Sequence, residues 1–336
     1  MLNSCTSDCN DQDKACLKKK VLNHRARHID FYSNYLDKPV SDKVFHAPKE
    51  LIDFVNLDNR KIDIPNRAYK SKYFDKIAPL TQRALDELPN VIKSKFSSKL
   101  IGIFLLDDLG STGFTDMAKD SDGNIKGAFI ILDAEVLAKR SANQWASWKE
   151  NTPFTEGELK VSLKIENNEN DNIKNAIQYI LLHELGHVVA INTDIHPAWD
   201  REDDQLDLSK YPFTALSWSL KDKELISQFQ RVAPKYRPYK TLNYYYGERL
   251  DNSEMIPIYN FLSLTNIPTL YGVMNTGDDW AESFVTYAHS VLMKKPFKLT
   301  IVKEDKVIYE HQLCYFNANC PGKLKYLENY FNSSSQ

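Results

Sequence analysis

The sequence lacks any apolar run long enough to cross a bilayer, since stretches such as LIGIFLL and AFIIL have the length of single strands. It also lacks an excess of charge, with a formal net charge of −2 over 336 residues. This balance gives no electrostatic case for a nucleic-acid partner, and the locally basic run from Lys18 to His28 is typical of a solvated helix face. Internal repeats are absent. The composition therefore indicates a globular protein with one large core or two smaller ones.

Cysteine is scarce, and its five positions are informative. Cys9 lies close to Cys16 and Cys314 lies close to Cys320, so two local disulfides are one pairing among several. The remaining Cys5 stands in LNSC, which resembles a bacterial lipobox. This resemblance predicts an exported protein whose signal peptide is largely missing from the chain. A lipid on Cys5 would then attach the protein to an envelope membrane. A cytoplasmic chain with reduced thiols is the alternative.

The chain divides into two regions of different character. Residues 1–96 read as an N-terminal region of helical and linker segments. In residues 97–336, strand patterns come first and helical patterns follow. KLIGIFLLDD (99–108) predicts a buried strand, and the stretch 110–133 predicts two strands around an Asp-Gly turn. This order predicts an α+β fold.

Two further segments are assigned by pattern. AEVLAKRSANQWASW (134–148) predicts one helix, and KLTIVKEDKVIYEHQL (298–313) predicts a hairpin near the C-terminus. A cysteine loop and a short helix are expected after the hairpin.

The stretch NENDNIKNAIQYILLHELGHVVAI (168–191) predicts a helix that begins with capping Asn and Asp residues. His183 and His187 are four residues apart and share a face, so both rings can reach one ion at about 2.0–2.1 Å. Glu184 projects about 100° away, beside the ion, where it can take a proton from a water that the metal activates. The pattern is that of an HExxH zinc site.

A buried core helix with two satisfied histidines is the alternative interpretation of this stretch. Burying two histidines and a glutamate without a partner is costly, which favours the metal site. Gly186 points the same way, because a helix-interior glycine costs about 1 kcal/mol relative to alanine. Close packing or access to the metal would justify that cost.

Two histidines need a third ligand to hold zinc. The metzincin pattern requires glycine and histidine where this chain has Ala190 and Thr193, which excludes that class. His196 precedes Pro197 in a predicted loop, and Asp207 lies in an acidic stretch typical of a solvated loop. Neither is a favoured ligand.

The remaining candidate stretch is YGVMNTGDDWAESFVTYAHS (271–290), which predicts a helix beginning near Asn275. Asp278 and Glu282 are four apart and share a face, so one carboxylate can bind the metal while the other orients a ligand histidine. A negatively charged first turn that complements the helix dipole is the alternative.

These residues resemble the gluzincins, and most closely the lethal-factor-like secreted metallopeptidases of bacteria. In that family a tyrosine is followed seven residues later by a metal-binding glutamate and then by an AE pair with phenylalanine. Here Tyr271 is followed by Asp278 and then by Ala281-Glu282-Ser283-Phe284. The resemblance, which covers about residues 170 to 290, implies that Asp278 is the third ligand, Glu282 its partner on a histidine, and Tyr271 the donor to the oxyanion. Aspartate is one methylene shorter than the family's glutamate, so either the two helices approach more closely or Glu282 is itself the ligand.

The resemblance implies a zincin-like catalytic domain: a small mixed sheet with the HExxH helix and a second ligand-bearing helix. The expected function is a zinc-dependent peptidase acting on a peptide or protein, with Glu184 as general base. The substrate would lie along a sheet edge provided by GFTDMA or KGAFIIL, framed by the residues between the two helices. A zinc amidase acting on cell-wall peptides and a catalytically silent binding protein are the alternatives. The sequence does not indicate an oligomeric state.

Overall fold

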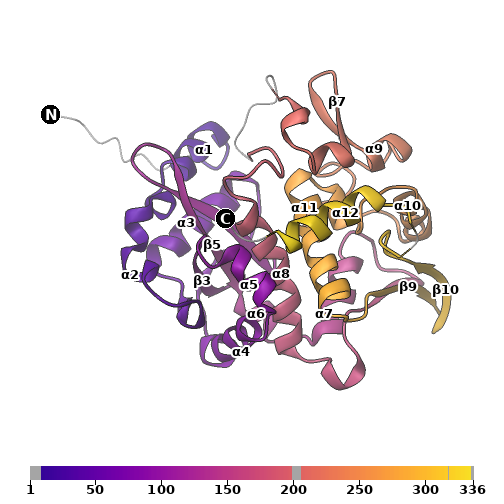
Figure 1. Ribbon diagram of the computed structural model, residues 1–336, viewed down its shortest axis with the longest axis horizontal. Coiled ribbons are helices and arrows are strands. Elements are labelled where there is room, and N and C mark those ends of the chain that lie inside the picture. Colours follow the sequence, from indigo (N-terminus) through magenta and orange to yellow (C-terminus); the bar gives the residue numbers. More distant parts are fainter. Residues whose placement is uncertain (1–8, 199–205, 317, 334–336) are drawn as a thin grey trace.

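A mixed α+β fold is seen in the computed structural model, which describes residues 9–198, 206–316 and 318–333 (Figure 1). Its strands form one five-stranded sheet and two smaller ones, with helices packed around them, which confirms the predicted α+β class. Among the described helices, none combines the length and hydropathy needed to span a membrane. The lipobox cysteine Cys5 lies outside the described residues.

The five-stranded sheet contains the strands that the sequence predicts in 99–133. Its order is β1 (Val44–His46), β3 (Leu100–Asp107), β5 (Ile125–Asp133) and β4 (Gly113–Lys119), and β2 (Tyr69–Lys70) pairs with β3. Strands β1, β3 and β5 are parallel neighbours, and β4 runs antiparallel to β5. KGAFIIL belongs to β5, which is paired on both sides, so the expectation that it could form the sheet edge is wrong. GFTDMA belongs to β4, the last strand of the sheet.

Both faces of this sheet are covered, because successive side chains of a strand point to opposite faces. Ile103 and Leu105 of β3 belong to the larger core, and Phe104 and Leu106 belong to a second cluster on the other face. In Figure 1 the helices α1 to α3 lie on one side of β3 and β5, and α8 lies on the other. These helices are α1 (Lys14–Leu22), α2 (Ser33–Leu36), α3 (Lys49–Lys61) and α8 (Ile173–Ala190). Two further helices, α4 (Phe74–Asp86) and α5 (Asn90–Phe96), contribute to the larger core.

The N-terminal region is part of this layered structure. Strand β1 lies within residues 1–96 and pairs with β3, and α3 supplies Leu51, Phe54 and Val55 to the second cluster. Residues on both sides of position 96 therefore contribute to the same sheet and the same cluster.

The predicted helix over 134–148 is two helices, α6 (Ala134–Leu137) and α7 (Ala142–Asn151), so the prediction of one helix is wrong. Ser141 is the N-cap of α7, and its backbone N–H donates to the side-chain carbonyl of Gln144 at 3.1 Å. This local signal overrides the continuous helical pattern.

A second sheet contains the predicted C-terminal hairpin. Strands β9 (Lys298–Lys303) and β10 (Lys306–His311) pair antiparallel, which confirms the hairpin, and β6 (Leu159–Lys164) joins β9 on its other side. Helix α12 (Pro321–Asn332) follows. The cysteines form the two local disulfides Cys9–Cys16 and Cys314–Cys320.

Candidate metal centre

The HExxH residues lie on α8, a helix that begins at Asn172, whose side chain accepts the backbone N–H of Asn175. This confirms the predicted capped start. Helix α8 is buried on nearly all sides, and its His183 and His187 rings stand 5.0 Å apart, centroid to centroid. Two largely buried imidazoles are thus held one helical turn apart.

Helix α11 (Thr276–Tyr287) crosses α8 at Gly186. A Cβ built on Gly186 would lie 2.9 Å from the Cα of Ala281, which is closer than real Cβ contacts. The Trp280 indole N–H donates to the Gly186 carbonyl at 2.8 Å and fixes the crossing. Close packing therefore explains the helix-interior glycine.

This crossing brings Asp278 to the two histidines. Its Oδ1 lies 3.4 Å from His187 Nε2 and 3.8 Å from His183 Nε2. The three candidate ligand atoms all lie within 4.8 Å of one another, which is close enough for one ion to contact all of them. His183, His187 and Asp278 form a group positioned to bind a metal ion. Asn275, the N-cap of α11, donates to the other Asp278 oxygen at 2.7 Å and orients it.

Glu282 lies on the opposite side of His183. Its Oε1 is 2.9 Å from His183 Nδ1 and accepts from Lys149 Nζ at 3.0 Å, while its Oε2 accepts from Thr269 Oγ1 at 2.7 Å. The geometry thus places Asp278 near the Nε2 atoms of both histidines and Glu282 on the Nδ1 side of His183, where a carboxylate fixes ring orientation.

The charges around Glu282 shift its pKa and those of its partners. Burial disfavours the Glu282 carboxylate, but Lys149 and His183 outweigh burial and lower its pKa. Burial also acts against the Lys149 ammonium, yet Glu282 and Glu150 raise its pKa. For His183, burial is likewise outweighed, and Glu282 raises the imidazole pKa. The ion pair is therefore charged at neutral pH although it is buried.

Glu184 points from α8 to the edge strand β4. Thr115 Oγ1 donates to its Oε2 at 2.6 Å, and a Cβ on Gly113 would lie 2.5 Å from its Oε1. Gly113 and Thr115 share one face of β4, because residues two apart in a strand point the same way. The carboxylate is thus held between the metal-ligand helix and the start of the sheet edge.

Tyr271, on the short turn η9 (Tyr271–Val273), lies at the same site. Its ring centroid is 5.6 Å from that of His183, and Lys149 Nζ lies 4.3 Å from the centre of its ring. Burial, and after it the charge of Asp278, raises the pKa of the Tyr271 hydroxyl well above its usual range. The hydroxyl is therefore protonated at neutral pH and can donate a hydrogen bond.

An open cleft of about 180 Å³ lies beside this site. It meets a smaller cavity beside His183, Glu184 and Lys149, and both are lined by Gly113, Tyr245 and Tyr271. The walls of the larger cleft include α3 with the residue that follows it, the start of β4, and a tyrosine-rich segment. These segments supply Val55, Asp58, Ile62, Phe114, Tyr239, Tyr244 and Tyr246.

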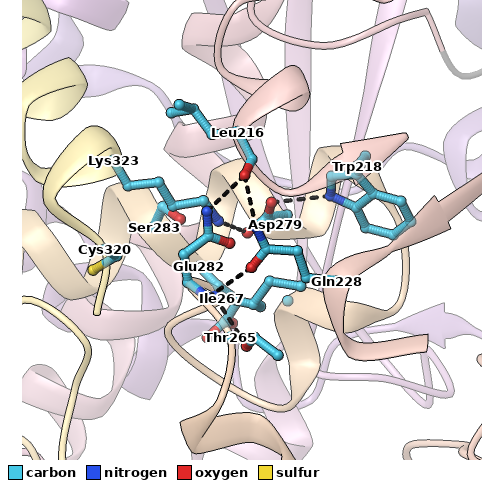
Figure 2. A network of polar contacts seen from close by, with 12 residues as sticks. Leu216, Trp218, Gln228, Thr265, Ile267, Asp279, Glu282, Ser283, Cys320 and Lys323 are labelled. Atoms are coloured by element: carbon cyan, nitrogen blue, oxygen red, sulfur yellow. Dashed lines mark hydrogen bonds and ion pairs between the residues drawn. The ribbon is translucent and has the colours of Figure 1, made fainter. Parts of the chain in front are cut away.

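The neighbouring Asp279 anchors α11 on its other side (Figure 2). Its carboxylate pairs with Lys323 of α12 and accepts the indole N–H of Trp218 at 3.0 Å. Both members of the Asp279–Lys323 pair are fully buried. Segments far apart in the sequence therefore fix the helix that carries Asp278.

The two disfavoured ligand candidates lie outside the metal group. The Nδ1 atom of His196 is 2.8 Å from the Pro197 carbonyl, and burial lowers the pKa of His196 to about 4. Asp207 caps the turn η6 (Leu208–Lys210) by accepting the N–H of Ser209 at 3.0 Å.

Several residues of the site were not found from the sequence. Asn275 had a usable signal, because an asparagine three residues before Asp278 has N-cap spacing. Gly113 and Thr115 carry the spacing of one strand face, but no pattern connects them to Glu184. Lys149 and Thr269 carry no signal in the sequence.

Comparison of the chain with protein-family models, with curated proteins and with solved structures gave no significant match.

Proposed function

We propose that the protein is a zinc-dependent peptidase with a zincin-like catalytic centre. The observation that carries the proposal is the position of the Glu184 carboxylate, which lies on the metal-ligand helix and against the open start of an edge strand. A general base between a metal and a sheet edge is placed to act on an extended backbone.

His183, His187 and Asp278 would hold the zinc ion. A bound zinc ion would polarise a water molecule, lower its pKa toward 7 and polarise the scissile carbonyl. Glu184 accepts the proton of the attacking water and then delivers it to the leaving amine. The Tyr271 hydroxyl donates to the carbonyl oxygen as negative charge develops there.

The substrate backbone would pair with the first part of β4. The later part is covered, because Arg27 contacts Asp116 through an ion pair of 3.2 Å and His28 forms a bridge with Lys119. Gly113 to Thr115 remain beside Glu184 and the cleft. A peptide or protein segment in extended conformation fits this short edge.

Export from the cytoplasm is part of the proposal, because the two disulfides Cys9–Cys16 and Cys314–Cys320 are typical of oxidising compartments. A lipid on Cys5 would then hold the enzyme at an envelope membrane. Mass spectrometry of the protein from its native membrane fraction tests this, since an unmodified Cys5 would contradict the anchor.

The test of the peptidase is hydrolysis of a mixed peptide library by zinc-loaded protein, followed by mass spectrometry. Glu184→Gln is the matched control, because it keeps size and hydrogen bonding and removes the base. We expect new peptide termini with the parent and at least a 100-fold slower reaction with Glu184→Gln, while zinc content is unchanged. Equal cleavage by both proteins would contradict the role of Glu184. A parallel digest of cell-wall peptides distinguishes a general peptidase from an amidase.

A further inference from the structure

Lys149 is a buried cation beside the metal centre. It lies on α7, and its side chain is 7% exposed. A lysine is rarely buried unless it is paired, and Lys149 has two carboxylate neighbours, Glu282 at 3.0 Å and Glu150 at 3.9 Å. The pairing with Glu282 connects it to His183.

The contacts of Glu282 show what this pairing does. Lys149 and the His183 ring share Oε1, and Thr269 occupies Oε2, so both carboxylate oxygens are engaged away from Asp278. Glu282 lies one helical turn from Asp278. Without the contacts to Lys149 and Thr269, its carboxylate could instead turn toward a bound metal ion.

Lys149 also contacts the proposed oxyanion donor. Its Nζ lies 4.3 Å from the ring centre of Tyr271, within the range of a cation–π interaction. One ammonium group therefore contacts both the carboxylate on the Nδ1 side of His183 and an aromatic ring that lines the cleft.

We propose that Lys149 is a positioning residue that keeps Glu282 on the Nδ1 side of His183, out of the metal's coordination sphere, and holds Tyr271 against the substrate cleft. The inference rests on the proposed metal site. It assigns the lysine no contact with the substrate.

The test compares Lys149→Met with the parent in three measurements: the zinc dissociation constant by chelator competition, the visible absorption of the cobalt-substituted protein, and kcat and KM. We expect zinc binding to weaken about 10- to 100-fold, the cobalt bands to change as Glu282 enters coordination, and kcat to fall more than KM rises. In Lys149→Met/Glu282→Gln the amide cannot replace a carboxylate ligand, so the cobalt bands should return toward those of the parent.

The matched control is Lys43→Met. Lys43 is a similarly buried lysine, but its Nζ donates to the Leu100 carbonyl at 2.6 Å on another element. We expect this control to lose stability without altering zinc affinity or the cobalt bands.

The outcomes separate this inference from the proposed function. If Lys149→Met matches the parent within about twofold in zinc affinity, cobalt bands and kcat, the lysine is only structural and the inference is overturned. A parent that binds zinc but cleaves no peptide contradicts the peptidase and still allows the affinity and cobalt tests. A parent that binds no zinc overturns both.

Discussion

The Cα of Ala281 lies 2.9 Å from the position that a Cβ on Gly186 would occupy. This contact sets the distance between α8 and α11, and at that distance the Asp278 carboxylate reaches the Nε2 atoms of both histidines, whereas Glu282 meets only Nδ1 of His183. The short side chain of Asp278 reaches them because the two helix backbones are so close.

The first prediction concerns this crossing. Gly186→Ala should destabilise the fold by about 1–3 kcal/mol through overpacking. This cost outweighs the gain of about 1 kcal/mol in helix propensity, because the new Cβ would meet the backbone of Ala281, which cannot move aside as a side chain can. Zinc affinity should fall with it, as Asp278 moves away. Urea unfolding and chelator competition measure the two effects. The control is Gly322→Ala, whose Cβ would meet only the tip of Leu216 at 3.1 Å; a loss as large as that of Gly186→Ala would argue against the crossing as the cause.

The second prediction concerns the general base. In Gly113→Ala the new Cβ would displace the Glu184 carboxylate, which is flexible, so the fold should survive while the base moves. A misplacement of about 1 Å can cost about 100-fold in rate, and we expect a fall in kcat of at least about 10-fold at unchanged zinc content. Unchanged kcat would mean that Glu184 does not act from the position seen here.

A third prediction tests the buried ion pair that anchors α11 (Figure 2). Lys323→Met leaves Asp279 buried without its cation, so the free energy of unfolding should fall by about 3–5 kcal/mol. Adding Asp279→Asn to this variant should restore part of the loss, because the uncompensated charge is gone while the Trp218 contact can remain. Denaturant titration of the parent and both variants measures this. Equal stability of the single and double variants would show that the pair is not coupled.

The fourth prediction is a pH dependence at His311, which is buried on β10 away from the metal centre. Burial lowers the pKa of His311 to about 4, whereas in the unfolded chain this pKa is near the ordinary histidine value of 6.5. The unfolded state therefore binds the proton first, and stability is lost as pH falls from 6.5 to 4, by about 3 kcal/mol from this residue. His311→Gln should flatten the stability curve in that window relative to the parent. Parallel curves for the two proteins would exclude the effect.

The HExxH half of the centre was predictable because it depends on one helix. His183, Glu184 and His187 follow from helix periodicity, and the capped start at Asn172 follows from local chemistry. Asp278 and Glu282 could be assigned to one face of a second helix. Which of them faces the Nε2 atoms of both histidines depends on the Gly186–Ala281 contact, a tertiary distance that spacing does not encode.

The remaining support of the site comes from segments with no sequence relation to the motif. Lys149 lies on α7 and Thr115 on β4, and each meets its partner only after the chain folds. The α+β class was predictable from the order of strands and helices. The packing of the N-terminal region against the sheet was not, because β1 is only three residues long.

The most direct test is the zinc content per chain, by elemental analysis, for the parent, Asp278→Ala and Glu282→Ala after equilibration with excess zinc and removal of unbound metal. We predict one zinc in the parent, none in Asp278→Ala, and a retained but more weakly held zinc in Glu282→Ala. No zinc in the parent, or loss of zinc with Glu282→Ala alone, would contradict the metal centre as described.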